Sequence, residues 1–325
     1  MIDFDALIKK TEAYKIISAE KKAGKLAHAY LIVCADKENL KSYLKGIAKL
    51  ILCDSENFCG KCRACVQTEE ENYADVYFYP TENKISTDDV VSLISESYVK
   101  PIEGDKKVFV LTGADEMLAP AQNKLLKTLE EPPKNVYILL GATTEYPILS
   151  TVKSRVRKLK IDSFEDGELF NALKKDYPDS ERLKNAISLS NGNLGSAISF
   201  YSDEKLEELF SFTDDLITDM QSSKQVLAFS TRFFSVGSSV TDFLSVLELK
   251  FRDMLLMAEG GEKLVKSEKN RIKLKGVAGY NVGSIIHALE KIAEARERKK
   301  FNANDVMLVE WLFFQILEGK YKWQK

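Results

Sequence analysis

Four cysteines within a short stretch are the clearest chemical signal in the sequence. Cys53, Cys59, Cys62 and Cys65 form a C-x5-C-x2-C-x2-C pattern inside CDSENFCGKCRAC. In a reducing compartment such closely spaced thiolates favour tetrahedral zinc, with each sulfur about 2.3 Å from one ion. Free thiols and a redox C-x-x-C pair are the alternatives, although a redox pair leaves two cysteines unexplained. Four sulfurs leave no open position for water, so we expect a structural Zn²⁺ site. Cys34 stands apart and is expected to be an ordinary buried thiol.

A second place for chemistry follows the first predicted strand, where nucleotide-binding proteins carry a phosphate-binding loop. That loop reads G-x-x-x-x-G-K-[ST], and its glycines bring backbone N–H groups against the phosphates. Residues 34–41 read CADKENLK, with no glycine. Leu40 holds the place of the lysine, and Lys41 holds the place of the hydroxyl that would bind magnesium. We therefore predict no ATP binding at this loop.

The acidic pair that an ATPase needs for magnesium and water is also missing. The apolar run 108–111 is followed by Thr112 and Gly113, and the acids Asp115 and Glu116 come later. We expect these two acids to lie on the loop surface. The sequence thus combines the frame of an ATPase with the loss of its catalytic groups.

A third candidate is the Ser154-Arg155 pair. A planar guanidinium can bind phosphate oxygens through two parallel hydrogen bonds and can stabilise charge in a transition state. From the residues alone, a surface or ion-paired arginine beside Arg157 and Lys158 is the leading interpretation.

These candidates need elements that position them, and residues 107–157 supply the central ones. The runs 108–111 and 136–140 predict two buried strands, and Pro120 to Pro132 predicts a helix between them. Strand, helix and strand at this spacing indicate a βαβ unit on a parallel sheet. Together with predicted strands at 26–33 and 75–80 and helices at 7–22, 38–52 and 86–97, they predict an open α/β domain. Ligands of such sheets bind beyond the carboxyl ends of the strands.

After residue 160 the pattern becomes helical. We predict an α/β plus all-α protein with an α/β domain at 1–160, a small helical domain at 161–205 and a helical bundle at 206–325. The long amphipathic segments of the bundle are 206–220, 222–234, 239–260, 281–298 and 303–319.

Composition excludes some function classes. The 47 basic and 49 acidic residues nearly cancel, so global charge predicts neither nucleic-acid nor membrane binding. The N-terminal stretch MIDFDALIKKTEAY is charged and amphipathic and does not resemble a signal peptide. No apolar run approaches the roughly 20 residues that span a bilayer. We expect a cytoplasmic protein with no membrane partner.

Several motifs resemble a known family when they are taken together. They are HAY at 28–30, CGKCRAC at 59–65, LLKTLEEPP at 125–133 and Ser154-Arg155. In this order and spacing they are similar to the clamp-loader subunits of bacterial DNA polymerase III, of the AAA+ class. The resemblance covers about residues 5–200, and the helical remainder is compatible with the collar domain of that family.

Within the family, the motor subunits (gamma/tau) keep the phosphate loop and the acidic pair. This sequence departs from both, and in Gly192-Asn193-Leu194-Gly195 the glycine at 195 takes the place of an ATP-sensing arginine. It is therefore similar to the delta-prime type of subunit. The resemblance implies an AAA+-like domain with a zinc knuckle at 53–65, a helical lid and a helical collar.

The resemblance also implies a function. We expect a non-catalytic stator, part of the polymerase holoenzyme, that assists ATP-dependent loading of the sliding clamp on primed DNA. Arg155 matches the family's arginine finger, which completes the ATP site of a neighbouring subunit, and Ser154 is its motif partner. Val156 replaces the cysteine that ends this motif. The implied partners are the motor subunits and the delta subunit through the collar, and the clamp and primer-template DNA through the complex.

Two alternatives come from other functional classes. An ATP-hydrolysing motor subunit would need the phosphate loop that residues 34–41 lack. A zinc-containing nucleic-acid-binding protein would be expected to have a basic surface round the cysteines, whereas Asp54, Glu56 and Glu69–Glu71 surround them.

Overall fold

The computed structural model describes residues 2–81, 84–265 and 279–322. The chain divides into two compact units, residues 1–176 with 192–195 and residues 177–191 with 196–325. The division into three domains near 160 and 205 stays a prediction.

The first unit is built on a five-stranded parallel sheet, so the predicted α/β fold is confirmed. Its strands lie in the order β2-β3-β4-β1-β5. Their bounds are β1 Ala29–Cys34, β2 Val76–Tyr79, β3 Lys107–Thr112, β4 Val136–Ala142 and β5 Arg157–Ile161. β1 and β3 are buried along almost their whole length, as their apolar runs predict.

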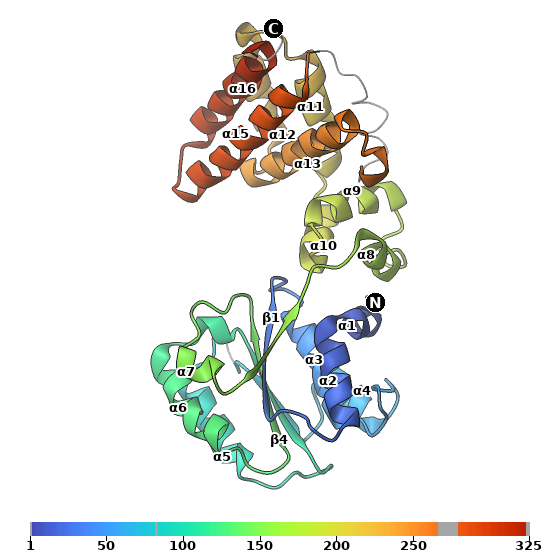
Figure 1. Ribbon diagram of the computed structural model, residues 1–325, viewed down its shortest axis with the longest axis vertical. Helices are drawn as coiled ribbons and strands as arrows, with labels where there is room; N and C mark the ends of the chain where they lie inside the picture. Colours follow the sequence, from blue (N-terminus) through green and yellow to red (C-terminus); the bar gives the residue numbers. More distant parts are fainter. Residues whose placement is uncertain (1, 82–83, 266–278, 323–325) are drawn as a thin grey trace. The chain divides into compact units, whose positions relative to one another are not determined.

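Helices cover both faces of this sheet (Figure 1). On one side lie α5 (Thr87–Ser97), α6 (Ala119–Glu130) and α7 (Ser150–Lys153), and on the other lie α1 (Phe4–Lys10), α2 (Glu12–Lys22), α3 (Leu40–Leu52) and α4 (Arg63–Glu69). A short 3₁₀ helix, η1 (Ala114–Glu116), follows β3, and α8 (Asp166–Leu173) follows β5. The predicted start of α5 is confirmed by a capping box between Ser86 and Asp89.

The amino-terminal helix differs from the prediction. One helix was expected over 7–22, but the chain breaks at Thr11 into α1 and α2. The extended backbone of Thr11 ends α1, and its hydroxyl accepts a hydrogen bond from the N–H of Tyr14 at 3.2 Å. Thr11 is thus both the end of one helix and the N-cap of the next.

β5 is a strand that the sequence pattern did not reveal. It pairs with β1 at the edge of the sheet. Leu159 and Ile161 point into the protein, while the intervening Lys158 and Lys160 are exposed. Basic side chains on an edge strand discourage pairing with other chains, and here they hide the strand's periodicity.

The packing of α3 on the sheet fixes the loop between β1 and α3. A Cβ at Gly141 of β4 would lie 2.5 Å from Leu44 Cδ1 and 3.2 Å from Leu40 Cγ. Only glycine lets the first turns of α3 rest directly on the strand. The start of α3, and with it residues 34–40, is therefore set by close helix-to-sheet contact.

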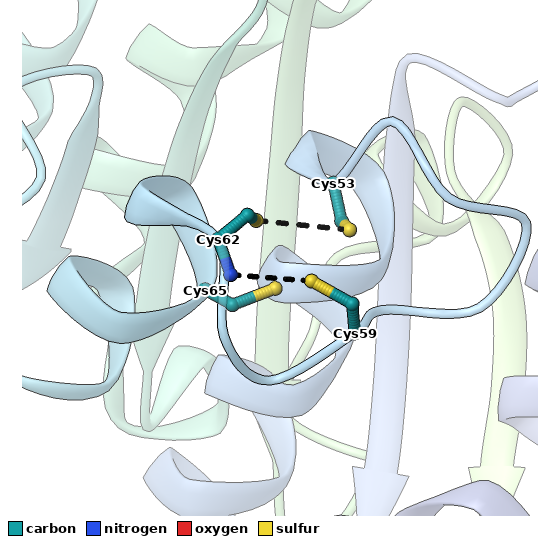
Figure 2. Close-up of side chains that lie close together, drawn as sticks. All are labelled: Cys53, Cys59, Cys62 and Cys65. Carbon is teal, nitrogen blue, oxygen red and sulfur yellow. Dashed lines mark hydrogen bonds between the residues drawn. The ribbon is translucent and has the colours of Figure 1, made fainter.

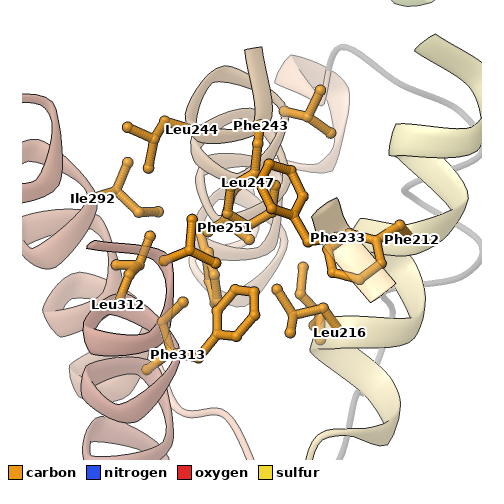
Figure 3. Close-up of a cluster of buried hydrophobic side chains, with 14 of the residues drawn as sticks. Phe212, Leu216, Phe233, Phe243, Leu244, Leu247, Phe251, Ile292, Leu312 and Phe313 are labelled. Carbon is orange, nitrogen blue, oxygen red and sulfur yellow. The ribbon is translucent and has the colours of Figure 1, made fainter. Parts of the chain in front are cut away.

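The second unit is helical, as predicted. Its helices are α9 Ser180–Ser190, α10 Leu194–Ser202 (whose first two residues belong to the first unit), α11 Leu206–Asp219, α12 Val226–Val236, α13 Val240–Ala258, α15 Val282–Lys300 and α16 Asp305–Lys322, with short 3₁₀ helices η2 Ser223–Gln225 and η3 Glu262–Leu264. Its core contains a cluster of aromatic rings (Figure 3). The Phe243 ring centroid lies 4.7 Å from that of Phe233, 6.0 Å from Phe212 and 5.9 Å from Phe313. Among the described residues, no helix has both the length and the hydropathy that crossing a bilayer requires.

Candidate functional site

The four cysteines of the predicted zinc site come together in the connection between α3 and α4. Cys53 ends α3, Cys59 and Cys62 lie in the loop, and Cys65 is in the first turn of α4. All four sulfur atoms lie within 4.8 Å of one another (Figure 2). The four residues therefore form a cluster that could hold one metal ion.

The spacing of these sulfurs fits zinc. The Sγ atoms of Cys53 and Cys62 are 3.8 Å apart, and the edge of a tetrahedron with Zn–S bonds of about 2.3 Å is about 3.8 Å. The backbone N–H of Cys62 donates a hydrogen bond to Cys59 Sγ at 3.2 Å. Gly60 turns the loop with φ of +72°, in the left-handed region that favours glycine.

The thiols of the cluster differ in acidity. Hydrogen bonds from the backbone N–H groups of Lys61 and Cys62 lower the pKa of Cys59 to about 6. Burial acts to raise the pKa of Cys53, but N–H donors of Cys59 and Ser55 outweigh it and the pKa is lowered. Burial raises the pKa values of Cys62 and Cys65. The pKa is thus lowered at two of the sulfurs and raised at the other two, and binding of a metal ion requires the thiolate form at all four.

The cysteine loop is fixed to its helices by Lys49 and Phe58. Lys49 is 3% exposed and pairs with Asp5 at 2.5 Å and with Glu69 at 2.8 Å. Its ammonium lies 4.8 Å from the centre of the buried Phe58 ring. A lysine buried to this extent needs such partners. The loop therefore rests on a surface that joins α1, α3 and α4.

The loop in the place of a phosphate-binding loop is organised by Asp36. This residue is 4% exposed. Its carboxylate accepts hydrogen bonds from the Asn39 N–H at 3.3 Å, the Asn39 side-chain amide at 3.0 Å, the Tyr43 hydroxyl at 3.1 Å and the Gly195 N–H at 3.2 Å. Burial, together with the charge of Asp36, raises the pKa of Tyr43, so its hydroxyl remains a donor.

The turn that carries Gly195 is held closely against this loop. A Cβ at Gly195 would lie 2.6 Å from Asp36 Oδ1 and 3.0 Å from Glu38 Oε2. The nearby Gly192, with φ of +80°, accepts a hydrogen bond from the Phe164 N–H at 2.9 Å. No side chain fits at position 195 in this arrangement, which agrees with the absence of an arginine there.

The carboxyl ends of β3 and β4 are joined by Asp115. Its Oδ2 accepts hydrogen bonds from the Thr143 N–H at 3.1 Å, the Thr143 hydroxyl at 2.5 Å and the Thr144 N–H at 3.3 Å. The prediction that Asp115 lies on the loop surface is therefore wrong, because the residue is half-buried and holds two strand ends together. The sequence pattern could not show that the turn after β3 reaches β4.

A cavity of about 300 Å³ lies beside these strand ends. Lysines line it, and carboxylates pair with each of them: Lys37 and Lys84 with Glu116, and Lys41 with Glu71. The cavity thus has cationic side chains, but acids of the same chain are bound to them.

Ser154 and Arg155 lie in the connection between α7 and β5, away from the cysteine loop in the sequence. The Arg155 side chain is 34% exposed, and its Nη2 lies 2.7 Å from Glu130 Oε1. Its Nη1 donates to the Thr151 carbonyl at 2.8 Å and to the Ser154 hydroxyl at 3.1 Å. Val156 packs against the core of the first unit. Val156 therefore provides an apolar anchor beside the arginine.

The sequence reasoning did not single out two residues that the structure makes prominent. Asp36 stands out in the sequence only as one residue of the stretch 34–41, and Glu130 only as one residue of the motif LLKTLEEPP. Asp36 binds a residue 159 positions later, which no local pattern can reveal. For Glu130, its place inside the motif LLKTLEEPP was the sequence feature that could have indicated a functional role.

Comparisons with known proteins agree with the motifs. A family model described as "DNA polymerase III, delta subunit" matches residues 9–165. The DNA polymerase III subunit gamma of Buchnera aphidicola (Schizaphis graminum) is 23% identical over 97% of this chain and 95% of its own. The subunit delta′ of Bacillus subtilis is 24% identical over 91% of this chain and 92% of its own. The solved structure of a gamma subunit-related protein of Thermotoga maritima aligns with 97% of this chain and 98% of its own chain. The sequence identity is 17% and the TM-score is 0.38.

Proposed function

We propose, from the premise that this chain is a clamp-loader subunit of the delta-prime type, that it works as a non-catalytic stator of the DNA polymerase III clamp loader. In this role it assists ATP-dependent loading of the sliding clamp on primed DNA but binds no ATP itself. The observation that carries the proposal is Asp36, whose buried carboxylate lies at the start of α3, where a nucleotide phosphate would have to bind.

The groups round this place support the same conclusion. Three donors near this place, the Asn39 N–H, the Tyr43 hydroxyl and the Gly195 N–H, already donate to Asp36. Bringing a polyphosphate close to this carboxylate would add repulsion between like charges in a poorly solvated place. Asp115, at the neighbouring strand end, accepts hydrogen bonds from Thr143 and Thr144 through its Oδ2 atom. A nucleotide would have to break several of these contacts at once.

Arg155 is the residue that we propose to act on ATP, in the site of a neighbouring subunit. Its guanidinium is half-exposed at the end of a short helix, and its partners Glu130, Thr151 and Ser154 are exposed residues. In a neighbour's site it would bind γ-phosphate oxygens and stabilise the charge that develops during hydrolysis. Ser154 orients it through the hydrogen bond to Nη1. Hydrolysis would then depend on correct packing of the two subunits.

The proposed metal is a structural Zn²⁺ held by Cys53, Cys59, Cys62 and Cys65. Four thiolates complete a tetrahedral shell and leave no coordination position for a substrate. The proposed effect of the ion is to fix the loop between α3 and α4, because binding energy at such a site is also folding energy.

The proposed partners are the motor subunits (gamma/tau) and the delta subunit, which contact the helical collar at 206–325. Two helices of this region that pack on each other carry exposed apolar residues. Leu227 and Phe234 lie seven positions apart on α12, and Met307 and Phe314 lie seven positions apart on α16. Exposed apolar rows of this kind suit packing against helices of another subunit. The sliding clamp and primer-template DNA would be met through the assembled complex, and the helices at 161–205 would form the lid.

Reconstitution with the native partners tests the proposal. An Arg155→Ala chain should join the complex normally and slow its DNA-stimulated ATPase, by roughly 10³-fold at the one site that the arginine completes. Arg157→Ala is the matched control, because Arg157 is exposed in the same segment and pairs with Glu20. An unchanged rate in the Arg155 variant would leave Arg155 with only a structural role. ATP hydrolysis by the isolated wild-type chain would instead support the motor-subunit alternative.

A further inference from the structure

The ion pair of Arg155 joins the two most specific motifs of the sequence. Glu130 is the last residue of α6, in LLKTLEEPP, and Arg155 follows α7. Glu130 Oε1 lies 2.7 Å from Arg155 Nη2, while Nη1 is engaged by the Thr151 carbonyl and the Ser154 hydroxyl. The guanidinium is thus held by its own helix through one nitrogen and faces a carboxylate through the other.

The remaining donors show what this arrangement means for a phosphate. A guanidinium has five N–H groups, and it binds oxyanions best through two parallel bonds. With Nη1 engaged by Thr151 and Ser154, the edge formed by Nε and Nη2 is left for an incoming phosphate. Glu130 already lies against Nη2. The carboxylate therefore occupies the place that one phosphate oxygen would need.

We propose that Glu130 is a positioning residue for Arg155. Glu130 orients the Arg155 guanidinium in the free subunit and releases it to the phosphate of a neighbour's nucleotide. This inference rests on the proposed role of Arg155. The side chains of the pair are 34% and 48% exposed, and an ion pair this exposed is weak enough to be exchanged. A fully buried pair could not be exchanged without leaving a charge unpaired.

The exchange leaves a carboxylate beside a polyanion. After Arg155 has turned to the phosphate, the Glu130 carboxylate repels that phosphate. Glu130 therefore opposes ATP binding at that site to a small extent. Removing the charge should make the exchange easier. We expect Glu130→Gln to lower the ATP concentration that half-saturates this site by up to about fivefold, the most that an exposed ion pair is typically worth.

The reconstituted complex provides the first test. The ATPase activity that is lost in Arg155→Ala is assigned to the site that Arg155 completes. The dependence of this activity on ATP concentration is then compared in wild type, Glu130→Gln and Glu131→Gln. Glu131 is the matched control, because it is the adjacent exposed acid and forms no ion pair within the part of the chain that the structure describes. A shift in Glu130→Gln alone supports the inference. An unchanged or higher half-saturating concentration overturns it.

If Arg155→Ala leaves the ATPase unchanged, the proposed function itself fails, and this outcome is distinct from a failure of Glu130 alone. A second measurement needs only the full-length free chain. Exchange of the Arg155 guanidinium protons, including those on Nη2 that face Glu130, should be faster in Glu130→Gln than in wild type or Glu131→Gln when it is followed by nitrogen-15 NMR, at an unchanged thermal midpoint. Equal exchange rates in all three proteins would overturn the inference. Glu130→Asp, which keeps the charge but shortens the side chain, serves the same comparison if Glu130→Gln does not fold.

Discussion

The backbone N–H of Gly195 donates a hydrogen bond to the carboxylate of Asp36 at 3.2 Å, across 159 positions of the chain. This bond joins the first turn of α10 to the loop after β1. Asn39 and Tyr43 donate to the same carboxylate from the start of α3. The Asp36 carboxylate thus gathers the donors of the region in which related ATPases would bind phosphate.

The contact between Gly195 and Asp36 gives a prediction for stability. Gly195→Ala should lower the free energy of unfolding by about 1–3 kcal/mol, because the new Cβ would lie 2.6 Å from Asp36 Oδ1. Helix propensity alone predicts the opposite sign, a gain of up to about 1 kcal/mol. Denaturant unfolding of the two proteins measures the difference.

Gly167→Ala is the matched control for this substitution. Gly167 is the second residue of α8, as Gly195 is of α10, and a Cβ there would meet nothing within 4 Å. It should be neutral or slightly stabilising. If both substitutions stabilise the protein equally, the close approach of Gly195 to Asp36 does not exist in solution.

The internally bound carboxylates give a prediction for nucleotide binding. Calorimetric titration of the isolated chain with Mg-ATP should show no binding, since Asp36 holds the donors and repels the phosphates. A motor subunit titrated under the same conditions is the positive control. Micromolar affinity of this chain for Mg-ATP would contradict the proposal and favour the motor-subunit alternative.

The cysteine cluster gives a prediction for metal content. Metal analysis of the purified chain should find one zinc ion per molecule, and Cys62→Ser should lose it and unfold at a lower temperature, because the ion stabilises only the folded loop. Cys34→Ser is the control: this thiol is buried outside the cluster, and burial raises its pKa to about 11. A Cys62→Ser protein that retains stoichiometric zinc would refute the four-thiolate site.

Much of the fold followed from the sequence because its strongest signals are local. The buried runs at 108–111 and 136–140 formed β3 and β4, and Pro120 and Pro132 bounded α6 closely. The helical segments after residue 206 formed α11 to α13, α15 and α16. Periodicity and proline placement act within one element, so they can be recognised in one stretch of sequence.

The missed features depend on contacts between distant segments. β5 carries lysines at alternate positions because it lies at the edge of the sheet, which only the pairing with β1 determines. The position predicted for Asp115 was wrong because its partners, Thr143 and Thr144, follow another strand. The cysteine spacing did indicate a cluster, since four ligands in one loop are brought together by local turns.

The Asp36 carboxylate is part of the chain and cannot dissociate as a bound phosphate can, which has a consequence for regulation. A phosphate bound at the start of α3 would leave and return as ATP and ADP concentrations change, but a carboxylate on the chain stays at a constant effective concentration. If the chain binds no ATP, as proposed, the turn at 192–195 is held in the same way at every ratio of ATP to ADP. In the proposed complex, such a subunit would keep the geometry of this turn while ATP is bound and hydrolysed elsewhere.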